Sequence, residues 1–326
     1  MDATGRLHRS VPFVAALVLL ALPAVLTPYT HDLVVKIAIY AVFALSLELL
    51  VGIAGLVSLG HAAFLGIGAY VTVLASGDSG GSLAVVLPLA VTAAAAYALF
   101  VGALSLRTRG VYFIMVTLAF AQMAYFVFHD TKLAGGSDGI FLYAKPTLGT
   151  LVNLDDKRQM YFAAIGTLIA TYALLAVLMR SRFGHALAGI RVNEQRMRAA
   201  GYATYGYKLA AFVIAGALAG VAGFLLAVKD GAVNPELLSW HESGAVLLML
   251  ILGGIGSLRG AVIGAIAFTL LKELFQLEAL LGPMAAHWQL TLGLTIIAFV
   301  ALLPKGLIGL GARVAANGAP GAGRHE

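Results

Sequence analysis

Cysteine is absent from the 326-residue sequence, and charged residues are scarce, at 11% of the chain. The absence of cysteine excludes disulfide bonds, thiolate metal sites and a cysteine nucleophile. A soluble globular protein has about 25% charged residues, so this low charge excludes an ordinary soluble enzyme. The hydrophobic fraction is 61%, which at about 20 apolar residues for each bilayer crossing is enough for about ten transmembrane helices. The composition therefore predicts an all-α polytopic membrane protein.

Several motifs of catalysis and binding are also missing. No Gly-Lys dipeptide occurs, so the chain lacks a Walker A loop for nucleotide phosphates. Zinc-protease and nucleophile-elbow patterns are absent, and no histidine pair has the spacing of metal ligands. No basic run with interleaved aromatic residues indicates nucleic acid. We therefore expect no catalytic residue, metal or cofactor in this chain, and no nucleic-acid partner.

Apolar segments separated by glycine, proline or charged residues recur along the chain. The first, at residues 11–26, lacks the small-residue cleavage pattern of a signal peptide and is interpreted as an uncleaved span. The other expected spans cover residues 33–53, 57–76, 83–106, 110–128, 159–179, 209–228, 244–257, 260–281 and 289–303. Glycines interrupt the region 244–281, which is compatible with two spans or with one broken span.

Lysine and arginine are unevenly distributed between the two sides of these spans. If the N-terminus lies inside, most of them fall on the cytoplasmic side. This is the expected distribution, because cytoplasmic loops are enriched in lysine and arginine. We therefore expect both termini to be cytoplasmic. We expect a single transmembrane domain at 1–310, with a periplasmic loop at 129–158, a cytoplasmic loop at 180–208 and a disordered tail at 311–326.

Few ionisable residues fall within the expected spans. A charge near the bilayer centre costs about 2.5–3.5 kcal/mol, so such residues face the bundle interior, a partner or water. Glu48 and His61 are therefore candidates for a translocation pathway. For Glu48, an interhelical hydrogen bond is an equally good interpretation. Lys272 and Glu273 are expected near a span end, at the membrane interface.

Glycine is abundant, with 38 residues, and it clusters within the apolar segments. Spacings of about four residues allow helix backbones to approach closely, which favours helix packing in a membrane. Two groups show this spacing: Gly216, Gly220 and Gly223, and Gly256, Gly260 and Gly264. A third group interrupts the expected span at 57–76 and its approach, together with Ser58 and His61, and fits either packing or a pathway with freed backbone groups: Gly52, Gly55, Gly60, Gly66 and Gly68.

The loop at 180–208, RSRFGHALAGIRVNEQRMRAAGYATYGYK, predicts a short amphipathic helix. Its apolar face contains Ala186, Leu187, Ile190 and Met197, and its polar face contains Arg191, Glu194 and Arg198. Such a helix can lie on anionic lipid or dock into a groove of another protein. The pattern alone does not separate these two functions.

Six blocks of the sequence, in order, resemble the LivM-type permeases of branched-chain amino acid ABC transporters. They are GLVSLGHAAFLGIGAY (55–70), RGVYFIMVTLAFAQM (109–123), GGSDG (135–139), GIRVNEQRMRAAG (189–201), LLMLILGGIGSLRGAVIGA (247–265) and PKGLIGL (304–310). The resemblance spans most of the chain. It implies a type II-like ABC importer permease bundle in a bacterial inner membrane.

The resemblance also implies partners. They are a second permease of LivH type, two cytoplasmic ATPase subunits of LivG and LivF type that carry ATP and Mg, a periplasmic substrate-binding protein and the lipid bilayer. The implied substrate is a branched-chain amino acid, or a related small amino acid or amide. The chain itself would be a translocation subunit and no enzyme.

The resemblance further assigns functions to particular residues. In the coupling loop that docks onto the ATPases, the matching residues are Gly184, Ile190, Arg191, Asn193, Glu194 and Gly201. The resemblance also implies that segments 55–70 and 109–123 line the translocation pathway, with His61, Thr117 and Gln122 as polar contacts. Together with Glu48 and Ser58, these are the candidate pathway residues. The alternatives are a secondary transporter or channel for a small polar solute that works alone, for which Glu48 and His61 would be central, and, less favoured, a membrane enzyme using His61 or His129.

Overall fold

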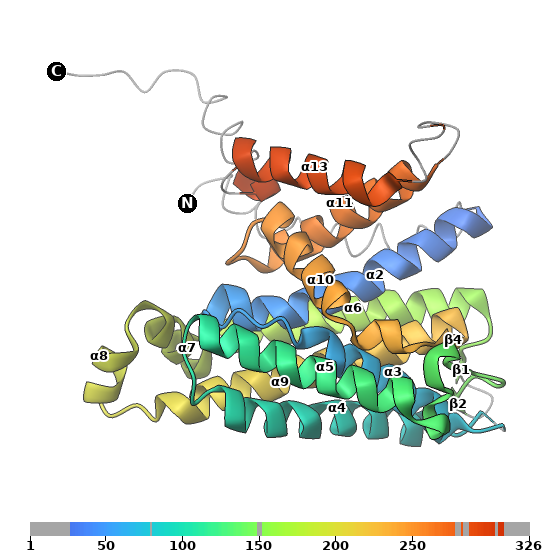
Figure 1. Cartoon of the computed structure of the whole chain (residues 1–326), viewed down its shortest axis with the longest axis horizontal. Coiled ribbons are helices and arrows are strands. Elements are labelled where there is room, and N and C mark those ends of the chain that lie inside the picture. The colour runs from blue at the N-terminus through green and yellow to red at the C-terminus, as the bar shows by residue number, and fades with distance from the viewer. Residues whose placement is uncertain are drawn as a thin grey trace, which may run out of the picture.

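The computed structural model describes residues 27–78, 80–148, 152–277, 282, 287–303 and 306–309. Long helices that run side by side make up most of this part of the chain (Figure 1). The expected span at 11–26 and the expected tail at 311–326 lie outside the described residues. The all-α polytopic fold predicted from the composition is confirmed.

Six helices among the described residues are long and apolar enough to cross a membrane, or up to seven if the bent pair α10 and α11 counts as one span. Six labelled helices carry these spans: α2 (Pro28–Glu48), α4 (Leu83–Ser105), α5 (Val111–Asp130), α6 (Lys157–Arg180), α9 (Thr204–Asp230) and α13 (Trp288–Leu302). The π-helical turn η2 (Leu49–Ala54) continues α2. Helix α3 (His61–Ser76) is apolar but shorter.

The glycine-rich region at 244–281 forms two helices that meet at a sharp break. Helix α10 (Trp240–Gly253) and helix α11 (Leu258–Gln276) are bent by 114° relative to each other. The intervening residues include Gly254 and Gly256, whose φ angles of 110° and 98° lie in the region that favours glycine. The chain therefore turns back on itself here and does not continue as one straight span.

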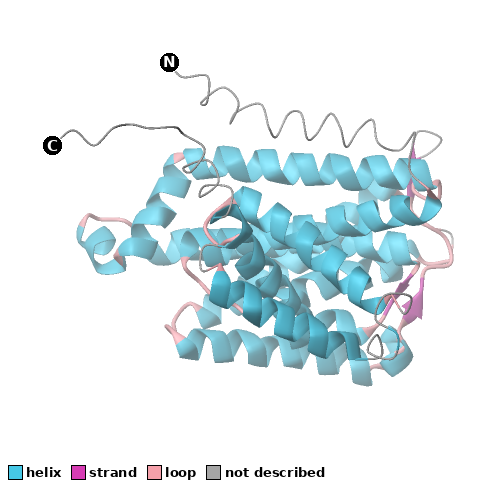
Figure 2. Ribbon diagram, turned by 90° about the horizontal axis from the view of Figure 1, so that it is seen from above, coloured by secondary structure: helices cyan, strands magenta, loops and turns pink. Residues whose placement is uncertain are grey.

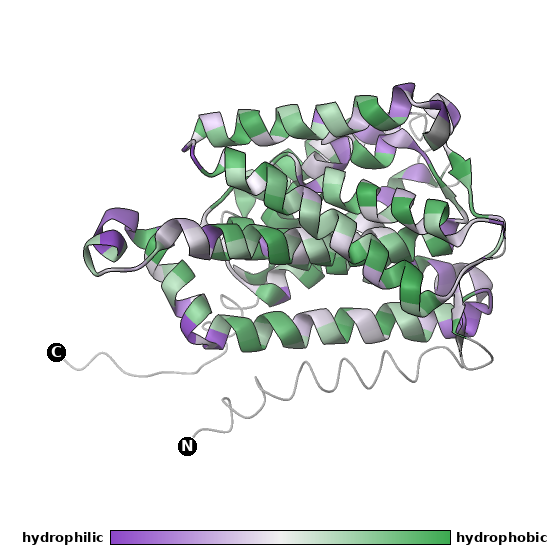
Figure 3. Cartoon of the chain, turned by 90° about the horizontal axis from the view of Figure 1, so that it is seen from below, coloured by the Kyte–Doolittle hydropathy of each residue, from purple (hydrophilic) through white to green (hydrophobic). Residues whose placement is uncertain are grey.

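Short elements mark the two ends of the bundle (Figure 2). Helices α7 (Arg182–Val192) and α8 (Glu194–Ala199) lie at one end, which we call the α8 end. The other end, the strand end, carries the antiparallel pairs β1 (Ile140–Phe141) with β4 (Ala232–Val233) and β2 (Thr147–Leu148) with β3 (Val152–Asn153). The 3-10 turns are η3 (Lys132–Ala134), η4 (Gly136–Asp138) and η5 (Pro235–Leu238). Hydrophilic residues concentrate at these two ends, and the helices between them are mostly hydrophobic (Figure 3).

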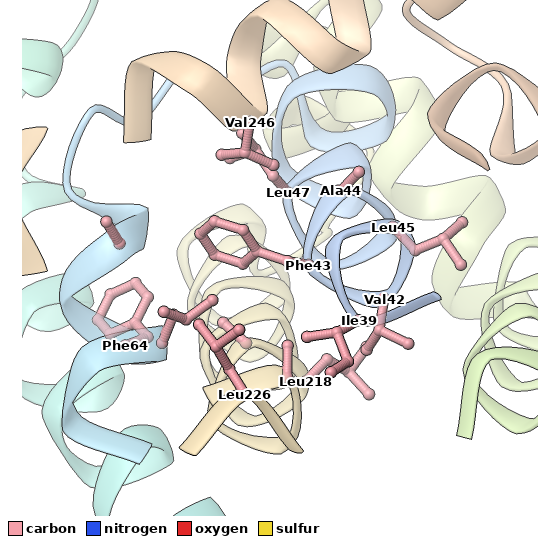
Figure 4. Close-up of a cluster of buried hydrophobic side chains, with 14 of the residues drawn as sticks. Ile39, Val42, Phe43, Ala44, Leu45, Leu47, Phe64, Leu218, Leu226 and Val246 are labelled. Atoms are coloured by element: carbon pink, nitrogen blue, oxygen red, sulfur yellow. The ribbon is translucent and has the colours of Figure 1, made fainter. Parts of the chain in front are cut away.

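Helices α2 and α9 form the centre of the bundle. In their most apolar windows, 89% of the residues from Pro28–Ala54 and 78% of those from Thr204–Asp230 are buried, against 19–28% in α4, α5, α6 and the span that begins at Trp288. Side chains of α2 such as Phe43 and Leu47 pack near Phe64 of α3, Leu226 of α9 and Val246 of α10 (Figure 4). The outer helices expose apolar side chains, as expected where lipid is as apolar as the core.

The glycines of α9 allow α4 to pack closely against it. A Cβ atom built at Gly216 would lie 2.3 Å from the Cβ of Ala98, and one at Gly220 would lie 2.6 Å from the Cβ of Ala94. Real Cβ atoms do not approach this closely, so a larger residue would force the helices apart. The predicted packing function of these glycines is confirmed.

Candidate functional site

The loop at 180–208 folds as two short helices and not as the single amphipathic helix that its sequence predicts. Asn193 has extended backbone angles (φ −157°, ψ 98°) and its side chain accepts a hydrogen bond from the Arg196 amide at 2.9 Å. It thereby caps the N-terminus of α8, a position that favours asparagine. The local capping preference of Asn193 breaks the helix, so α7 and α8 form an angled element at the α8 end (Figure 1).

The faces of α7 follow the predicted pattern. Ala186, Leu187 and Ile190 are buried against the bundle. Gly184 also faces inward, since a Cβ there would lie 2.5 Å from the Met179 Cα atom. Val192, the last residue of α7, is 84% exposed, so the element exposes an apolar side chain where α7 ends.

A charged cluster fastens α8 to α9. Glu194 Oε1 accepts hydrogen bonds from Arg198 Nη2 at 2.6 Å, Lys208 Nζ at 3.0 Å and Thr204 Oγ1 at 3.1 Å. Burial opposes ionisation of Glu194, but the hydrogen bond and charge of Lys208, with the hydrogen bonds of Thr204 and Arg198, outweigh it and lower its pKa below the usual value. Lys208 is 6% exposed, so this pair is largely withdrawn from solvent. Gly201 lies in the turn between the two helices with a φ of 86°.

Arg191 connects α7 to the end of the central helix. Its Nη1 atom donates a hydrogen bond to the Gly52 carbonyl in η2. The last carbonyls of a helix have no partner within the helix, and Gly52 is near this end because η2 stops at Ala54. The Arg191 side chain also lies against Gly55, where a Cβ would be 2.9 Å from its Cγ atom.

A cavity of about 630 Å³ lies at the α8 end between the α7–α8 element and the bundle. One side includes Ile190, Arg191 and Glu194, and the other includes segments 54–57 and 108–110. The first residues of segments 55–70 and 109–123 therefore share one cavity with residues of the coupling loop.

Glu48 is completely buried near this cavity but does not line it. Its Oε1 atom accepts a hydrogen bond from the Gly256 amide at 2.7 Å. Gly256 lies in the break between α10 and α11, so this is an interhelical contact, as one of the two interpretations of Glu48 predicts. A Cβ at Gly52 would lie 1.9 Å from the same Oε1 atom, so the carboxylate lies directly across Gly52.

Three of the other predicted pathway residues, Ser58, His61 and Thr117, lie around the start of α3. All three are fully buried. His61 Nε2 lies 2.7 Å from Ser46 Oγ, and its ring stacks on Phe43 with 5.4 Å between ring centroids. Ser58 Oγ accepts a hydrogen bond from the Gly60 amide at 3.2 Å.

Thr117 belongs to a close contact between α3 and α5, because a Cβ at Gly60 would lie 2.3 Å from its carbonyl oxygen. Gln122 is half-buried on α5. The structure thus brings Ser58, His61 and Thr117 together in the packed interior, and Gln122 and Glu48 lie apart from them. The cavity lining includes none of the five.

Four residues of the site were not predicted to make the contacts that the structure shows. Lys208 and Thr204 lie beyond the matched motif, and they reach Glu194 only because α9 folds back beside α8. Gly256 was expected only as a packing residue, yet its amide binds Glu48. Ser243 of α10 accepts a hydrogen bond from the Ala62 amide at 2.9 Å, a contact between residues distant in sequence.

Lys272 and Glu273 lie near the end of α11. Tyr29 donates a hydrogen bond to Glu273 Oε1 at 2.8 Å, and Lys36 Nζ lies 3.8 Å from Glu273 Oε2. The Lys272 ammonium lies 5.2 Å from the centroid of the Trp288 ring. These contacts near helix ends fit the expected interfacial position.

Comparison with known proteins identifies relatives over nearly the whole chain. The sequence profile of the family described as branched-chain amino acid transport system / permease component matches residues 29–300. The high-affinity branched-chain amino acid transport system permease protein LivM of Escherichia coli is 30% identical over 321 residues, which cover 91% of this chain and 74% of that protein. The corresponding LivH protein of Escherichia coli is 24% identical over 289 residues, covering 83% of this chain and 91% of LivH.

A more distant similarity covers part of the chain. The xylose transport system permease protein XylH of Haemophilus influenzae is 30% identical over 132 residues, or 38% of this chain and 35% of that protein. No solved structure matches the chain significantly.

Proposed function

Because the chain belongs to the branched-chain amino acid transport system permease family, we propose that it carries leucine, isoleucine and valine into the cell. It is a multi-pass permease subunit of an ABC importer and not an enzyme, since ATP hydrolysis belongs to partner subunits. The match to LivM over 91% of the chain carries this conclusion. Its partners in the proposal are a LivH-type permease, LivG- and LivF-type ATPases that hold ATP and Mg, and a periplasmic binding protein.

The α7–α8 element is the proposed coupling site for the ATPases. It lies at the end of the bundle, and Val192, the last residue of α7, is 84% exposed. The residues that match the coupling motif mostly have contacts within the chain, because Ile190 is buried, Arg191 binds Gly52 and Glu194 binds Lys208. They hold the element in place, and the exposed residues of α7 and α8 would contact the ATPases. The α8 end is then cytoplasmic.

The translocation pathway in this proposal lies between this chain and the second permease. Helix α5 supports this placement, since it carries the polar, half-buried Gln122 beside the exposed Met123, and polar side chains within spans face a partner or water. The 630 Å³ cavity would be part of the cytoplasmic mouth. Movement of the coupling element by ATP binding and hydrolysis would open the pathway first outward and then inward.

Reconstitution tests the proposed transport activity. The two permeases, two ATPases and binding protein are placed in proteoliposomes, and uptake of labelled leucine is measured with competing isoleucine, valine or urea. We expect uptake that requires ATP and the binding protein and that isoleucine and valine inhibit. Ion-driven uptake by this chain alone, without nucleotide, would instead establish a secondary transporter.

A paired substitution tests the coupling surface. Val192→Asp places a charge on the exposed tip of α7, and Tyr143→Asp does the same at a 78% exposed residue at the strand end. We expect Val192→Asp to reduce co-purification of the ATPases about tenfold, as for a residue central to an interface. Tyr143→Asp should leave it unchanged. Equal ATPase recovery from both variants would exclude α7 as the docking surface.

A further inference from the structure

Glu48 is a buried acidic residue in the most buried helix of the bundle. It is 0% exposed, and so are its neighbours Leu47 and Leu50. A carboxylate in such surroundings is costly unless specific contacts compensate for the loss of water. Its Oε1 atom has the Gly256 amide at 2.7 Å. Among the described residues Oε2 has no well-aligned hydrogen-bond partner, although the Ser257 backbone lies beside the carboxylate.

The Glu48 carboxylate lies against the turn of η2 that Arg191 of α7 contacts. Gly52 follows Glu48 by one turn, and the absence of a side chain there leaves room for Glu48 Oε1. The carbonyl of Gly52 accepts the hydrogen bond from Arg191 Nη1. Arg191 is also close enough to act electrostatically on Glu48. Two contacts therefore meet at one turn of η2, one from α7 and one from the break between α10 and α11.

The contact with Gly256 falls at the point that sets the angle between two helices. Gly256 lies between the last residue of α10, Gly253, and the N-cap of α11, Ser257. Its φ of 98° is one that other residues rarely adopt. A hydrogen bond to its amide therefore fixes the backbone where α10 and α11 diverge by 114°.

We propose that Glu48 is a positioning residue that links the α7–α8 element to the break between α10 and α11, so that displacement of α7 changes the angle between these helices. The chain of contacts is Arg191 to Gly52, Gly52 to Glu48 and Glu48 to Gly256. Beside this rigid link lies the 630 Å³ cavity, which leaves the rest of the element room to move. This inference rests on the proposed coupling function of α7 and α8.

Both side-chain oxygens of Glu48 matter in this arrangement, because one accepts from the Gly256 amide and the Ser257 backbone lies beside the carboxyl group. Glu48→Gln keeps the length of the side chain and one oxygen that can accept from Gly256, but it replaces the second oxygen with an NH2 group, which cannot accept a hydrogen bond. This variant therefore weakens the link with little change in volume.

The experiment uses the complete transporter in proteoliposomes and measures ATP hydrolysis and leucine uptake on the same sample. We expect Glu48→Gln to lower the uptake per ATP hydrolysed about tenfold, within the usual range of coupling between sites. Basal ATP hydrolysis should stay within about twofold of the wild-type value, because the ATPases keep their docking surface. Thr269→Val is the matched control, since Thr269 is buried on α11 and its hydroxyl has no partner among the described residues.

A double variant tests whether the contacts act as one unit. If they do, Arg191→Met and Glu48→Gln together should lower uptake per ATP no further than the stronger single variant. Additive losses, or a wild-type ratio in Glu48→Gln, would overturn the proposal. Absence of ATP-driven uptake in the wild-type complex would instead refute the proposed function, so the two failures are distinguishable.

A distance measurement keeps the proposal testable if Glu48→Gln does not assemble. The chain has no cysteine, so spin labels can be attached at Trp240→Cys on α10 and Leu274→Cys on α11, where both native side chains are exposed. Nucleotide should change the distance between the labels in the parent complex. In Arg191→Met, which alters an exposed residue, the distance should no longer respond. A response equal to that of the parent would show that the link carries no motion.

Discussion

At the scale of single residues, the Glu48 carboxylate leaves no space for a side chain at Gly52. A Cβ there would lie 1.9 Å from Glu48 Oε1, so Gly52→Ala should displace the carboxylate and lower the free energy of unfolding by about 1–3 kcal/mol. Gly166→Ala is the control, because nothing lies within 4 Å of a Cβ at that position in α6. It should stabilise by about 0.5–1 kcal/mol. Thermal unfolding in detergent measures both variants, and equal midpoints would contradict the packing around Glu48.

Because of Glu194, the stability of the α8 end should depend on pH. Its pKa in the folded chain is lowered, so folding favours the ionised form. The stabilisation is complete above the ordinary glutamate pKa of about 4.3 and is lost as the pH falls through the lowered pKa. Glu194→Gln should therefore cost about 1–2 kcal/mol near pH 7 and almost nothing at the lowest pH.

Unfolding midpoints of the wild-type chain and of Glu194→Gln, compared between pH 3 and pH 7, test this dependence. Asp155→Asn is the control, because the Asp155 side chain is 74% exposed and pairs with Lys145 at 3.3 Å. Exposed pairs contribute little to stability. A difference between wild type and Glu194→Gln that does not change with pH would show that the charge of Glu194 is unimportant.

At the scale of elements, the break between α7 and α8 depends on Asn193. Asn193→Ala removes the side chain that accepts from the Arg196 amide and should destabilise α8 by about 1 kcal/mol. Hydrogen exchange at the amides of α8 should accelerate about fivefold in this variant and return to the wild-type rate in Asn193→Ser, which restores a capping oxygen. Unchanged exchange in Asn193→Ala would mean that the Glu194 contacts alone hold α8.

At the scale of the whole molecule, the two ends of the bundle should lie on opposite sides of the membrane. Arg196→Cys at the α8 end and Asp155→Cys at the strand end place single thiols in a chain without cysteine. In intact cells a membrane-impermeant maleimide should label Asp155→Cys at once, and Arg196→Cys only after permeabilisation. Labelling in the reverse order would invert the orientation on which the coupling proposal depends.

The sequence predicted the fold best where one physical signal dominated. Long apolar segments predicted α2, α4, α5, α6 and α9 closely, because the bilayer thickness fixes the length of a span. The helix boundary at Asn193 was missed because the amphipathic period continues through it, whereas the capping of the Arg196 amide interrupts the helix. The angle between α10 and α11 was not predictable, since glycines permit many angles and tertiary contacts select one.

The candidate site was only partly predictable. The inward face of α7 followed from its periodicity, and the burial of Glu48 followed from the cost of a charge in a membrane. The partners of these residues did not follow, because Gly52 with Arg191 and Glu48 with Gly256 join residues far apart in sequence through backbone groups. Backbone carbonyls and amides are common to nearly all residue types, so no sequence motif identifies them as contact partners.

The cavity beneath the α7–α8 element has an osmotic consequence. Its volume of about 630 Å³ is far larger than the about 30 Å³ that one water molecule takes up in the liquid, so the cavity has room for several waters. Any movement of α7 and α8 that narrows the cavity must expel this water into the surrounding solution. Solutes too large to enter the cavity lower the activity of water in the surrounding solution. They therefore favour the conformation in which the cavity is narrow. The conformational balance of the protein should thus respond to osmolality, even at constant nucleotide and substrate concentrations.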